Sequence, residues 1–540
     1  MSRVIALAGG VGAVVSGNAL CSQIGTDVLE SGGNAADAIV AAELCLGVVY
    51  MFDTGPGGGG FALVRSPEGK YECVDFRETA PASAFEDMFK DNDIASLRGG
   101  LASGVPGNLR GLAYIHKKHG SKPWAQLLHP AIELASHGFA VYQDLVDVFG
   151  GLEDPSFLID DPAWAADFSP NGRLLRLGEQ LKRPRYADFL RTIAKGGAEA
   201  FYLGPLAEAT VKAVQTANGT MTLEDLAHYT PIIREPVIIQ YREFLIRSCG
   251  APGGGGVVLN VLKTAEGYCL SEPNQLNISM HRLVESMRFG YGARTQLGDP
   301  SFVINVTDFQ DSMLSNERAE RVRSKISDEN TLPVDEYNPD GLAVANTHGT
   351  SHLSAADKSG MTIALTSTIN LWFGSRVQVP ETGLILNNEM NDFSIPGVKN
   401  AFGYPPSPAN FIRPGKRPLS SMSPTIVEYL NSGHAHSTVG AAGGSRIISA
   451  VVQALWSVLD RGFDYQEALR MPRFHDQLQP NVTEFEYEFN NATTAFLASK
   501  GHSEEWAVRG SDMHALWTLP DGRFAAAADP ALHNASGIAV

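Results

Sequence analysis

The stretch "ANTHGTSHLSAADKSG", residues 345–360, places two histidines, two threonines and two serines within eight residues, from Thr347 to Ser354. So many potential nucleophiles and metal ligands in one short segment indicate a catalytic or metal-binding role. The segment lacks the G-x-S-x-G turn that exposes a nucleophilic serine, and it carries no recognisable metal signature. The β-branched, alternating residues of 350–357 and 361–373 predict two strands, the first within this segment and the second directly after it. If the segment is catalytic, one of its side chains must be the nucleophile, and a base must lie beside that side chain.

The Gly349–Thr350 bond offers one solution. A threonine hydroxyl is a poor nucleophile unless a base lies beside it. Cleavage just before Thr350 would free an α-amine with a pKa of roughly 7.7–8.0, which can take the proton of the neighbouring hydroxyl. Gly349 would let that hydroxyl approach the carbonyl for self-cleavage. Most Gly-Thr pairs are turns or strand starts, so the local pattern alone leaves both interpretations open.

The composition is that of a folded protein with an acidic balance. Apolar residues make up 44% and charged residues 19% of the 540 residues, and the formal net charge is −17. The length allows two to four domains or one large two-part unit. The negative charge argues against a nucleic-acid partner, because phosphates require a basic surface. No window is predicted to span a membrane.

Helical periodicity dominates the first part of the chain, and strand patterns follow it. Residues 326–343 are polar and contain proline, which is typical of a linker. Beyond it, "SPTIVEYL" (423–430) predicts a further strand. This order of helix-rich and strand-rich segments predicts the α+β class, with helices and strands in layers (layered α/β) and antiparallel sheets at the centre. Helices are expected near 20–31, 35–48, 122–137, 185–196, 205–217, 278–296 and 446–458.

Two of the five cysteines stand out by position. Residues 18–47 read as two helices joined at Gly32–Gly33, with Cys21 and Cys45 at similar distances from the joint. In an antiparallel helical hairpin these positions lie side by side, so a disulfide is geometrically reasonable. Two buried free thiols are an equal alternative. No C-x-x-C pair occurs, which argues against a zinc or thioredoxin-like site.

Two other patterns favour structural interpretations. Gly55, Gly57 and Gly60 form G-x-G-x-x-G, but a helix precedes them and a strand-like segment follows, so a tight backbone turn is expected rather than a nucleotide site. His348 and His352, with His434 and His436, raise the possibility of a metal site. Two strand residues four apart lie about 13 Å from one another. No acidic residue stands at ligand spacing, so no metal is predicted.

The wider pattern resembles the γ-glutamyltransferases (γ-glutamyl transpeptidases) of the N-terminal-nucleophile hydrolase superfamily, and their eukaryotic branch most closely. The resemblance extends over nearly the whole chain. Pro56 departs from it where the family usually has another apolar residue, and Phe402 stands where bacterial relatives have a lid tyrosine. The segments that carry the resemblance are "GNALCSQIGTDVLESGGNAADA" (17–38), "GGGGFALVRS" (57–66), "DFRETAP" (75–81), "GVPGNLRG" (104–111), "HGTSHLSAAD" (348–357), "TSTINLWFGS" (366–375), "TGLILNNEMNDFS" (382–394), "PGKRPLSSMSPTI" (414–426) and "GAAGGSRI" (440–447).

The resemblance implies a four-layer α-β-β-α sandwich that cleaves itself between Gly349 and Thr350. Residues 1–349 would form a large subunit and residues 350–540 a small one. Thr350 would then carry the γ-glutamyl group as an ester. Neither a metal nor an organic cofactor would be needed.

The resemblance also implies roles for the remaining site residues. Arg77 would pair bidentately with the α-carboxylate of the γ-glutamyl group, helped by the hydroxyls of Ser420 and Ser421. The ammonium would lie among Asn370, Glu389 and Asp392. The N–H groups of Gly443 and Gly444 would form the oxyanion hole, and Thr368 would support Thr350. The structural alternatives are an Arg77–Glu78 surface pair, a capped turn before Pro424 and a solvated loop at 387–392.

The expected donors are glutathione and other γ-glutamyl compounds, including S-conjugates. The acceptor would be water or the amine of an amino acid or dipeptide. Two rival hypotheses remain: an acylase acting on another amide, and an inactive homologue that serves as a binding protein.

Several features bear on where the protein works. The Cys21/Cys45 pair and six N-x-S/T sequons favour an extracellular, secretory or vacuolar compartment. Residues 1–19 loosely resemble a signal peptide, but glycines interrupt the apolar run and the segment beginning at Gly12 already matches the mature fold. Either a leader lies outside this sequence or the protein is intracellular. The sequons are at Asn218, Asn277, Asn305, Asn481, Asn491 and Asn534.

Overall fold

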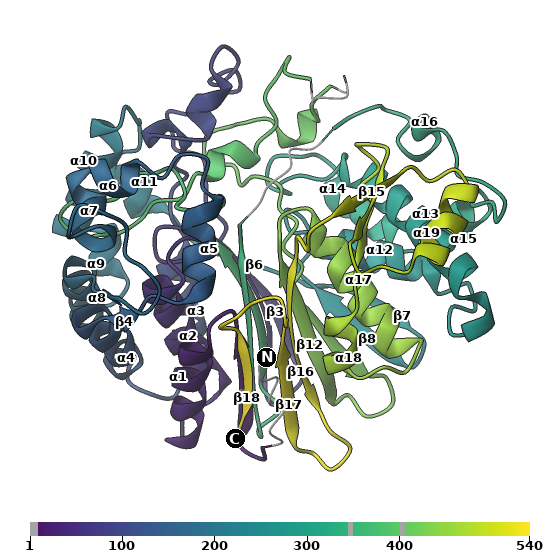
Figure 1. Ribbon diagram of the computed structural model, residues 1–540, viewed down its shortest axis with the longest axis horizontal. Helices are drawn as coiled ribbons and strands as arrows, with labels where there is room; N and C mark the ends of the chain where they lie inside the picture. Colours follow the sequence, from purple (N-terminus) through teal and green to yellow (C-terminus); the bar gives the residue numbers. More distant parts are fainter. Residues whose placement is uncertain (1–8, 344–348, 400–402, 404) are drawn as a thin grey trace.

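Two antiparallel sheets lie face to face between two layers of helices (Figure 1). The computed structural model describes residues 9–343, 349–399, 403 and 405–540. The expected positions of His348 and Phe402 therefore fall outside the described residues. The predicted α+β class and its α-β-β-α layering are confirmed: blue and purple helices cover one sheet, and teal to yellow-green helices cover the other (Figure 1).

The first sheet has seven strands and contains the strand that follows Thr350. Its order brings the two ends of the chain together, because the strand nearest the C-terminus pairs with the strand nearest the N-terminus. Every neighbouring pair runs antiparallel. In spatial order the strands are β18 (Ser536–Ala539), β1 (Gly12–Ser16), β9 (Ser351–Asp357), β10 (Thr362–Thr368), β2 (Gly59–Arg65), β3 (Tyr71–Asp75) and β6 (Ile232–Arg234).

The second sheet has six strands, also antiparallel throughout. A bulge between Val427 and Glu428 interrupts its central register. In spatial order its strands are β17 (Phe524–Ala528), β16 (Asp512–Thr518), β12 (Ala435–Ala442), β11 (Thr425–Tyr429), β8 (Phe244–Ser248) and β7 (Val237–Tyr241). Two small sheets join β13 (Phe474–His475), β14 (Thr483–Glu486) and β15 (Glu504–Ala507), and β4 (Phe139–Ala140) with β5 (Gln180–Leu181).

The helices divide between the two outer layers. Covering the first sheet are α1 (Ala19–Glu30), α2 (Ala35–Val49), α3 (Asn108–His119), α4 (Trp124–His137), α5 (Gln143–Gly151), α6 (Phe157–Asp160), α7 (Pro162–Phe168), α8 (Pro184–Gly196), α9 (Glu199–Tyr202), α10 (Pro205–Thr216) and α11 (Leu223–His228). On the side of the second sheet are α12 (Gly255–Ala265), α13 (Leu276–Arg294), α14 (Val306–Met313), α15 (Asn316–Arg323), α16 (Val334–Tyr337), α17 (Arg446–Leu459), α18 (Tyr465–Arg470) and α19 (Asn491–Ser499). Short 3₁₀ turns span Asp93–Ser96, Gly100–Ala102, Pro273–Gln275, Glu389–Asp392 and Pro408–Asn410.

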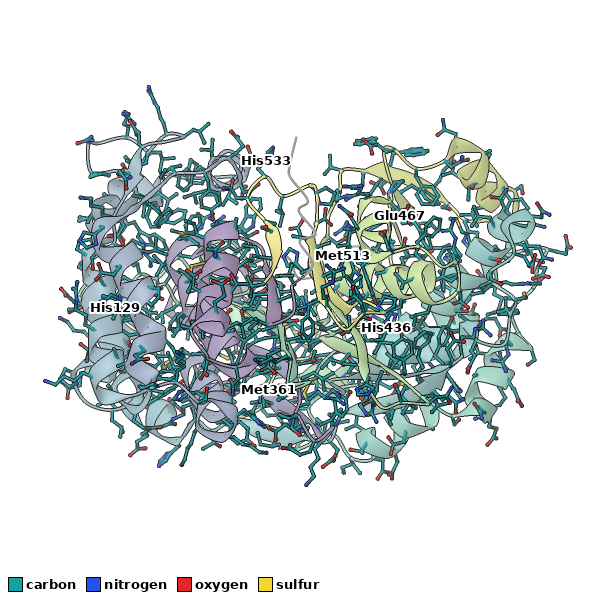
Figure 2. The ribbon with its side chains drawn as sticks, turned by 90° about the horizontal axis from the view of Figure 1, so that it is seen from below. His129, Met361, His436, Glu467, Met513 and His533 are labelled. Atoms are coloured by element: carbon teal, nitrogen blue, oxygen red, sulfur yellow. A yellow bond between two sulfur atoms is a disulfide. The ribbon has the colours of Figure 1, made fainter. Side chains whose placement is uncertain are left out.

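The helix α2 is the centre of the first helical layer, and every one of its residues is buried. Asn34 accepts a hydrogen bond from the Asp37 N–H, and the Asp37 carboxylate accepts one from the Asn34 N–H, which fixes where the helix begins. A helix that is apolar on all sides must be covered on all sides. It packs between the first sheet and the outer helix α4, which carries His129 (Figure 2). Met361 and Met513, also labelled there, are buried.

Successive side chains of β9 point alternately toward the helices and toward the second sheet. Leu353 and Ala355 point into the core shared with the helices. Ser354 and Ala356 point toward the second sheet, where the Ser354 hydroxyl lies 3.1 Å from that of Thr438. Even-numbered residues of this strand therefore face the space between the two sheets.

The predicted helices are confirmed, but the predicted linker is wrong. Residues 326–343 contain α16 and pack onto α13. Tyr337 is buried, its ring lies 4.7 Å from that of Phe289, and its hydroxyl donates to Glu285 at 2.6 Å. Ile326, Leu332 and Val334 of this segment also pack against the same core, and its overall polar composition concealed this docking.

The glycine-rich segment forms the expected turn rather than a nucleotide loop. It leads from α2 into β2, and a Cβ atom at Gly57 or Gly60 would collide with the backbone carbonyls of Ile385 or Thr366. Among the residues that the structure describes, no helix combines the length and hydropathy needed to cross a bilayer.

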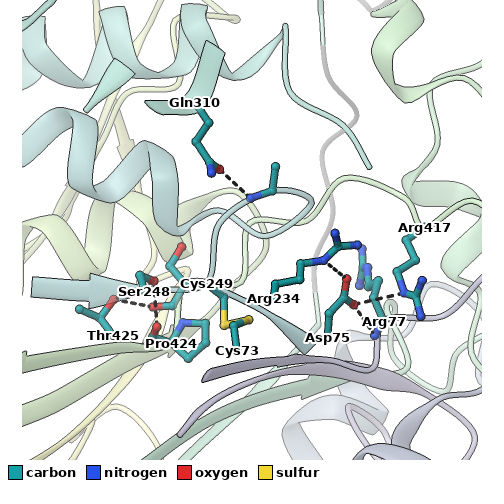
Figure 3. The surroundings of a disulfide bond; sticks show 12 residues. Cys73, Asp75, Arg77, Arg234, Ser248, Cys249, Gln310, Arg417, Pro424 and Thr425 are labelled. Atoms are coloured by element: carbon teal, nitrogen blue, oxygen red, sulfur yellow. Dashed lines mark hydrogen bonds and ion pairs between the residues drawn. A yellow bond between two sulfur atoms is a disulfide. The ribbon is translucent and has the colours of Figure 1, made fainter. Parts of the chain in front are cut away.

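Two disulfides cross-link the fold. Cys21 bonds to Cys45 and joins α1 to α2, which resolves the alternative that the sequence left open. Cys73 bonds to Cys249, a pairing that the sequence did not predict because 176 residues separate the two. Cys73 lies on β3 of the first sheet and Cys249 directly follows β8 of the second, so this bond ties the two sheets together (Figure 3).

Removing the Cys73–Cys249 disulfide is expected to destabilise the protein more than removing Cys21–Cys45. The two bonds close loops of 176 and 24 residues, and loop-closure entropy makes the longer one worth roughly 2 kcal/mol more. The thermal midpoints of the two double-alanine variants provide the comparison. Exposed Cys269 changed to Ser is the control and should leave the midpoint unchanged. An equal or larger loss in the Cys21/Cys45 variant would contradict this ranking.

Candidate active site

Thr350 directly precedes β9, beside the end of β10. Ser351 pairs with Ser367, so Thr350 and Thr368 are neighbours at adjoining strand ends. Thr368 ends β10, where even-numbered Ala364 packs with Ile426 of the second sheet, and Thr350 continues the alternation of β9, whose even-numbered residues face the same sheet. Strand periodicity and antiparallel register thus bring these two hydroxyls together between the sheets.

The peptide bond before Thr350 is held in a conformation that requires glycine. Gly349 has φ +106°, and a Cβ atom there would collide with the carbonyl oxygen of Asn370. The carbonyl of Gly349 accepts hydrogen bonds from the Thr350 hydroxyl and, at 2.9 Å, from the Thr368 hydroxyl. The Asn370 N–H donates to the Thr368 oxygen at 2.7 Å and orients it. The hydroxyl of Thr350, the predicted nucleophile, therefore lies against the carbonyl of the preceding residue, and a second hydroxyl also donates to that carbonyl.

Gly443 and Gly444 occupy the turn between β12 and α17. Their φ angles are +120° and +60°, and a side chain at Gly443 would strike the Gly510 carbonyl. The turn lies at the N-terminus of α17, where free backbone N–H groups and the helix dipole favour negative charge. Gly443 lines one cavity beside Thr350 and Gly444 lines another. This position suits an oxyanion hole.

The inner pocket is the cavity on the Gly444 side of Thr350. All six predicted substrate-binding residues line it, together with Thr350 and Thr368. Its volume is only about 10 Å³, room for about one water molecule. The residues that line it are Arg77, Gly349, Thr350, Thr368, Asn370, Glu389, Asp392, Ser420, Ser421, Met422, Gly444 and Ile447.

Arg77 is the cation of the inner pocket and is only 1% exposed. It forms ion pairs with Glu389 and Asp392 rather than with the adjacent Glu78. Burial alone would lower the pKa of Arg77, but these two carboxylates outweigh it and hold that pKa above its usual value. The alternative of a surface pair is therefore wrong, and so is the solvated loop, because Glu389 and Asp392 are buried as well.

The backbone of Arg77 is fixed by the strand that carries the inter-sheet disulfide. Asp75, at the end of β3, accepts a hydrogen bond from the Arg77 N–H at 3.1 Å. Arg234 and Arg417 flank the same carboxylate at 2.7 and 3.3 Å (Figure 3). Cys73 lies two residues before Asp75 on β3. The inter-sheet disulfide and Asp75, which holds the backbone of Arg77, thus lie on the same strand.

The carboxyl groups of the inner pocket outnumber its cations. Burial raises the pKa of Glu389 well above its usual value and that of Asp392 to a smaller degree, against the opposing effect of Arg77. Burial likewise raises the pKa of Glu78 to about 7, and neither of its oxygens has a hydrogen-bond partner among the described residues. An excess of buried acid next to one arginine provides a place for a second positive charge.

Ser420 and Ser421 lie on the opposite wall. The Ser420 hydroxyl oxygen accepts from the Met422 N–H at 3.1 Å, and that of Ser421 accepts from Arg294 at 2.9 Å. Arg294 and Glu78 were not identified from the sequence. Arg294 is the last residue of α13, which is buried over most of its length. Only its burial separates Arg294 from an ordinary surface arginine.

The outer cavity is the cavity on the Gly443 side of Thr350 and has a volume of about 510 Å³. Gly349 and Thr350 line both cavities, so Thr350 lies at their junction. The outer cavity is lined by Asp53, Gly151, Leu152, Glu153, Gly349, Thr350, Leu371, Trp372, Arg376, Ala442, Gly443, Arg509, Gly510 and Asp512.

Of the four histidines considered as metal ligands, His352 and His436 contact hydroxyls and aromatic rings. His352 is buried on β9, with its ring nitrogens 2.8 Å from the Thr366 hydroxyl and 3.0 Å from that of Ser354. Burial holds the pKa of His352 well below its usual value, so the ring is neutral. His436 packs against the rings of Phe244 and Tyr429.

Comparison with known proteins shows which family the chain resembles. The family model described as gamma-glutamyltranspeptidase matches residues 21–538. A glutathione hydrolase proenzyme of Arthroderma benhamiae is 50% identical over 98% of this chain and 93% of its own length. A glutathione hydrolase of Aspergillus flavus is 44% identical over 98% and 89%. The crystal structure of a cephalosporin acylase from Bacillus halodurans superposes with a TM-score of 0.85 at 26% identity, covering 100% of this chain and 98% of that one.

The family match covers far more than half of the sequence, and the two fungal relatives align over almost all of it. The chain belongs to the gamma-glutamyltranspeptidase family.

Proposed function

We propose that this protein is a γ-glutamyltransferase and glutathione hydrolase that uses Thr350 as an N-terminal nucleophile. The observation that carries the proposal is the position of the Thr350 hydroxyl beside a buried arginine and two buried acids. A γ-glutamyl group ends in an α-carboxylate and an α-ammonium. One cation and an excess of carboxylates are the complement of that zwitterion.

The first step is cleavage of the chain itself. The Thr350 oxygen attacks the Gly349 carbonyl carbon, the Gly349–Thr350 amide bond breaks, and an ester links Gly349 to the Thr350 oxygen. Water then hydrolyses that ester and leaves a carboxylate on Gly349 and a free α-amine on Thr350. The hydrogen bond from Thr368 to the Gly349 carbonyl would stabilise the developing oxyanion. The products are the proposed subunits, 1–349 and 350–540.

Donor binding exchanges internal ion pairs for external ones. Arg77 releases Glu389 and Asp392 and takes the donor carboxylate, with Ser420 and Ser421 as further donors. The two acids and the Asn370 side-chain carbonyl then hold the ammonium. Because the inner pocket admits about one water molecule in the uncut chain, these pairs must separate to make room.

Catalysis follows from the same arrangement. The α-amine of Thr350 takes the hydroxyl proton, the oxygen attacks the γ-carbonyl, and the N–H groups of Gly443 and Gly444 stabilise the oxyanion. The protonated amine gives its proton to the departing amine. Water or an acceptor amine then attacks the γ-glutamyl ester and regenerates the hydroxyl.

Cleavage tests the nucleophile directly. Thr350→Ala is expected to remain a single 57.8 kDa band on a denaturing gel and to lack turnover, because no hydroxyl remains to attack. Thr350→Ser keeps a hydroxyl and should still be cleaved. Two bands from Thr350→Ala after long incubation would show that another group cuts the chain.

The conformation of Gly349 gives a second prediction. Gly349→Ala is expected to slow cleavage strongly, since the added Cβ meets the Asn370 carbonyl and φ +106° disfavours any side chain. A time course on denaturing gels measures the rate. Gly341→Ala is the matched control, because it also has positive φ but no atom lies within 4 Å of its added Cβ. Equal cleavage of both variants and the parent would refute the steric argument.

Donor selectivity tests the inner pocket. Glu389→Gln should lower kcat/KM for γ-glutamyl-p-nitroanilide by roughly ten- to hundredfold, equivalent to about 1.5–3 kcal/mol for a charged hydrogen bond. Glutaryl-p-nitroanilide lacks the ammonium, so its already low rate should fall much less. Glu381→Gln, at an exposed acid, is the control. Equal losses for both substrates would favour the acylase alternative.

A further inference from the structure

Two histidines and a glutamate meet in the helical layer on the side of the second sheet. His281 and Glu285 stand one turn apart on α13, and His502 lies in the loop between α19 and β15. The helices α13 and α19 pack together (Figure 1). One ligand atom of each residue lies within 4.8 Å of those of the other two. Neither histidine was among those considered from the sequence, because 221 positions separate them.

All three side chains are withdrawn from solvent. His502 is 4% exposed, and His281 and Glu285 are fully buried. Nδ1 of His281 lies 2.8 Å from Nε2 of His502, which in turn lies 3.9 Å from Oε1 of Glu285. That Oε1 atom has no hydrogen-bond partner among the described residues. A buried carboxylate oxygen in this state is costly unless a donor or a cation reaches it.

The outer polar atoms of His281 and Glu285 are held by the segment that follows α15. Nε2 of His281 lies 2.7 Å from the carbonyl oxygen of Ser327, which can only accept, so Nε2 carries the proton and Nδ1 the lone pair. Oε2 of Glu285 accepts from the Tyr337 hydroxyl at 2.6 Å. Outer hydrogen bonds of this kind orient the histidine and carboxylate ligands of metal sites. Both residues therefore present a free ligand atom to the same space.

The charges near these residues leave Glu285 without a compensating cation. Burial lowers the pKa of His281 and of His502, so both rings are neutral, and it raises the pKa of Glu285 to about 7. A metal ion binds neutral imidazoles and supplies the positive charge that the carboxylate lacks. The surrounding cations pair with other acids: Arg288 with Asp476, Arg282 with Asp328 and Lys500 with Glu329.

We propose that His281, Glu285 and His502 bind a zinc ion through Nδ1, Oε1 and Nε2, respectively. Two imidazoles and one carboxylate are a donor set that zinc uses, with water in the fourth position. None of the three residues lines either cavity beside Thr350, so the ion is structural and takes no part in the reaction. It ties α13 to the loop before β15.

The position of the ligands along the chain adds a consequence. His281 and Glu285 precede Thr350, whereas His502 follows it. If the chain is cut before Thr350, the ion bridges the two subunits. This bridging rests on the proposed function, but zinc binding itself does not, because the ligands are already together in the uncut chain.

The site accommodates the ion with a small rearrangement. Zinc–nitrogen bonds of about 2.0–2.1 Å in a tetrahedron place two nitrogens about 3.3 Å apart. The two rings must therefore separate by about half an ångström, and Glu285 must approach His502 by a similar amount. The proton on Nε2 of His502 passes to Nδ1 of the same ring, and a proton held by Glu285 is released to solvent.

Metal content tests the site in the full-length protein without a histidine tag. The protein is stripped with a chelator, supplied with Zn²⁺ and dialysed, and the bound metal is measured by mass spectrometry. The parent should retain about one ion per chain, and His281→Gln and His502→Gln should each retain at least about tenfold less. Zinc-free parent protein that is folded, or full retention by both variants, would overturn the proposal.

His533→Gln is the matched control. His533 is an exposed histidine that lies near Asp144 and Asp147, so it forms the other cluster of potential ligands among the described residues (Figure 2). This variant should keep the zinc. Loss of the ion in His533→Gln, with retention in His281→Gln and His502→Gln, would place the ion at the surface and refute the buried site.

Tyr337→Phe is the finer test. It keeps the ring that packs against Phe289 and removes only the hydroxyl that holds Glu285. The zinc dissociation constant, measured by competition with a chromogenic chelator, should rise about ten- to hundredfold. Tyr487→Phe, at an exposed tyrosine, should leave it unchanged. An unchanged constant in Tyr337→Phe would contradict ligation by Glu285.

Cobalt spectroscopy of the unsubstituted protein keeps the test decisive where a variant folds poorly. Co²⁺ held tetrahedrally by two imidazoles, a carboxylate and water should give intense visible d–d bands, because a tetrahedral field lacks a centre of symmetry. Hydrated Co²⁺ is octahedral and gives weak bands. A spectrum with the weak bands alone would overturn the proposal.

Failure of this inference and failure of the proposed function are distinguishable. Thr350→Ala should bind zinc as the parent does, since no ligand belongs to the active site. A parent protein that binds zinc but neither cleaves itself nor turns over γ-glutamyl-p-nitroanilide would contradict the proposed function alone. A cleaved, active parent that binds no zinc would contradict this inference alone.

Discussion

The antiparallel pairing of β9 with β10 is the constraint on which the site depends. This pairing places Thr350 beside Thr368 and brings both hydroxyls to the carbonyl of Gly349. A one-residue slip would turn every side chain of β9 to the opposite face, because strand side chains alternate. The buried apolar residues on one face and the hydrogen-bonded polar residues on the other oppose such a slip. The register that forms the core is thus the register that brings the Thr350 and Thr368 hydroxyls to the Gly349 carbonyl.

The inner pocket contains buried charged side chains that are paired with one another. Arg77 forms ion pairs with Glu389 and Asp392, so that none of these three buried groups is left without a partner. A zwitterion offers the same two charges and can replace each internal partner by an external one. The cost of burying the ions is met in folding, so the donor binding proposed above would exchange partners rather than create new buried charge.

Thr350 lies at the junction of two cavities that come from different parts of the chain. The inner pocket combines the segment after β3 with the turns at 389–392 and 420–421, and the outer cavity combines α5, the loop after β10 and the start of β16. Both cavities lie where the two sheets meet. The Cys73–Cys249 bond joins these sheets close to the strand end that anchors Arg77, so it holds one wall of the site against the other.

The sequence by itself determined the helices, the strands around the nucleophile, the layered α+β class and the residues of the inner pocket, because helical and strand periodicities are local and the quoted motifs carry the family resemblance. It also placed Cys21 near Cys45, since a short helical hairpin relates them directly. Only the tertiary structure decided the pairing of Cys73 with Cys249, the docking of Tyr337 within the supposed linker, and the ion pairs of Arg77. Glu78, Arg294, Asp53, Asp512 and Arg376 belong to the same group: each is an ordinary charged residue in the sequence. Their setting comes from burial and from contacts between segments that are far apart along the chain, which no local pattern records.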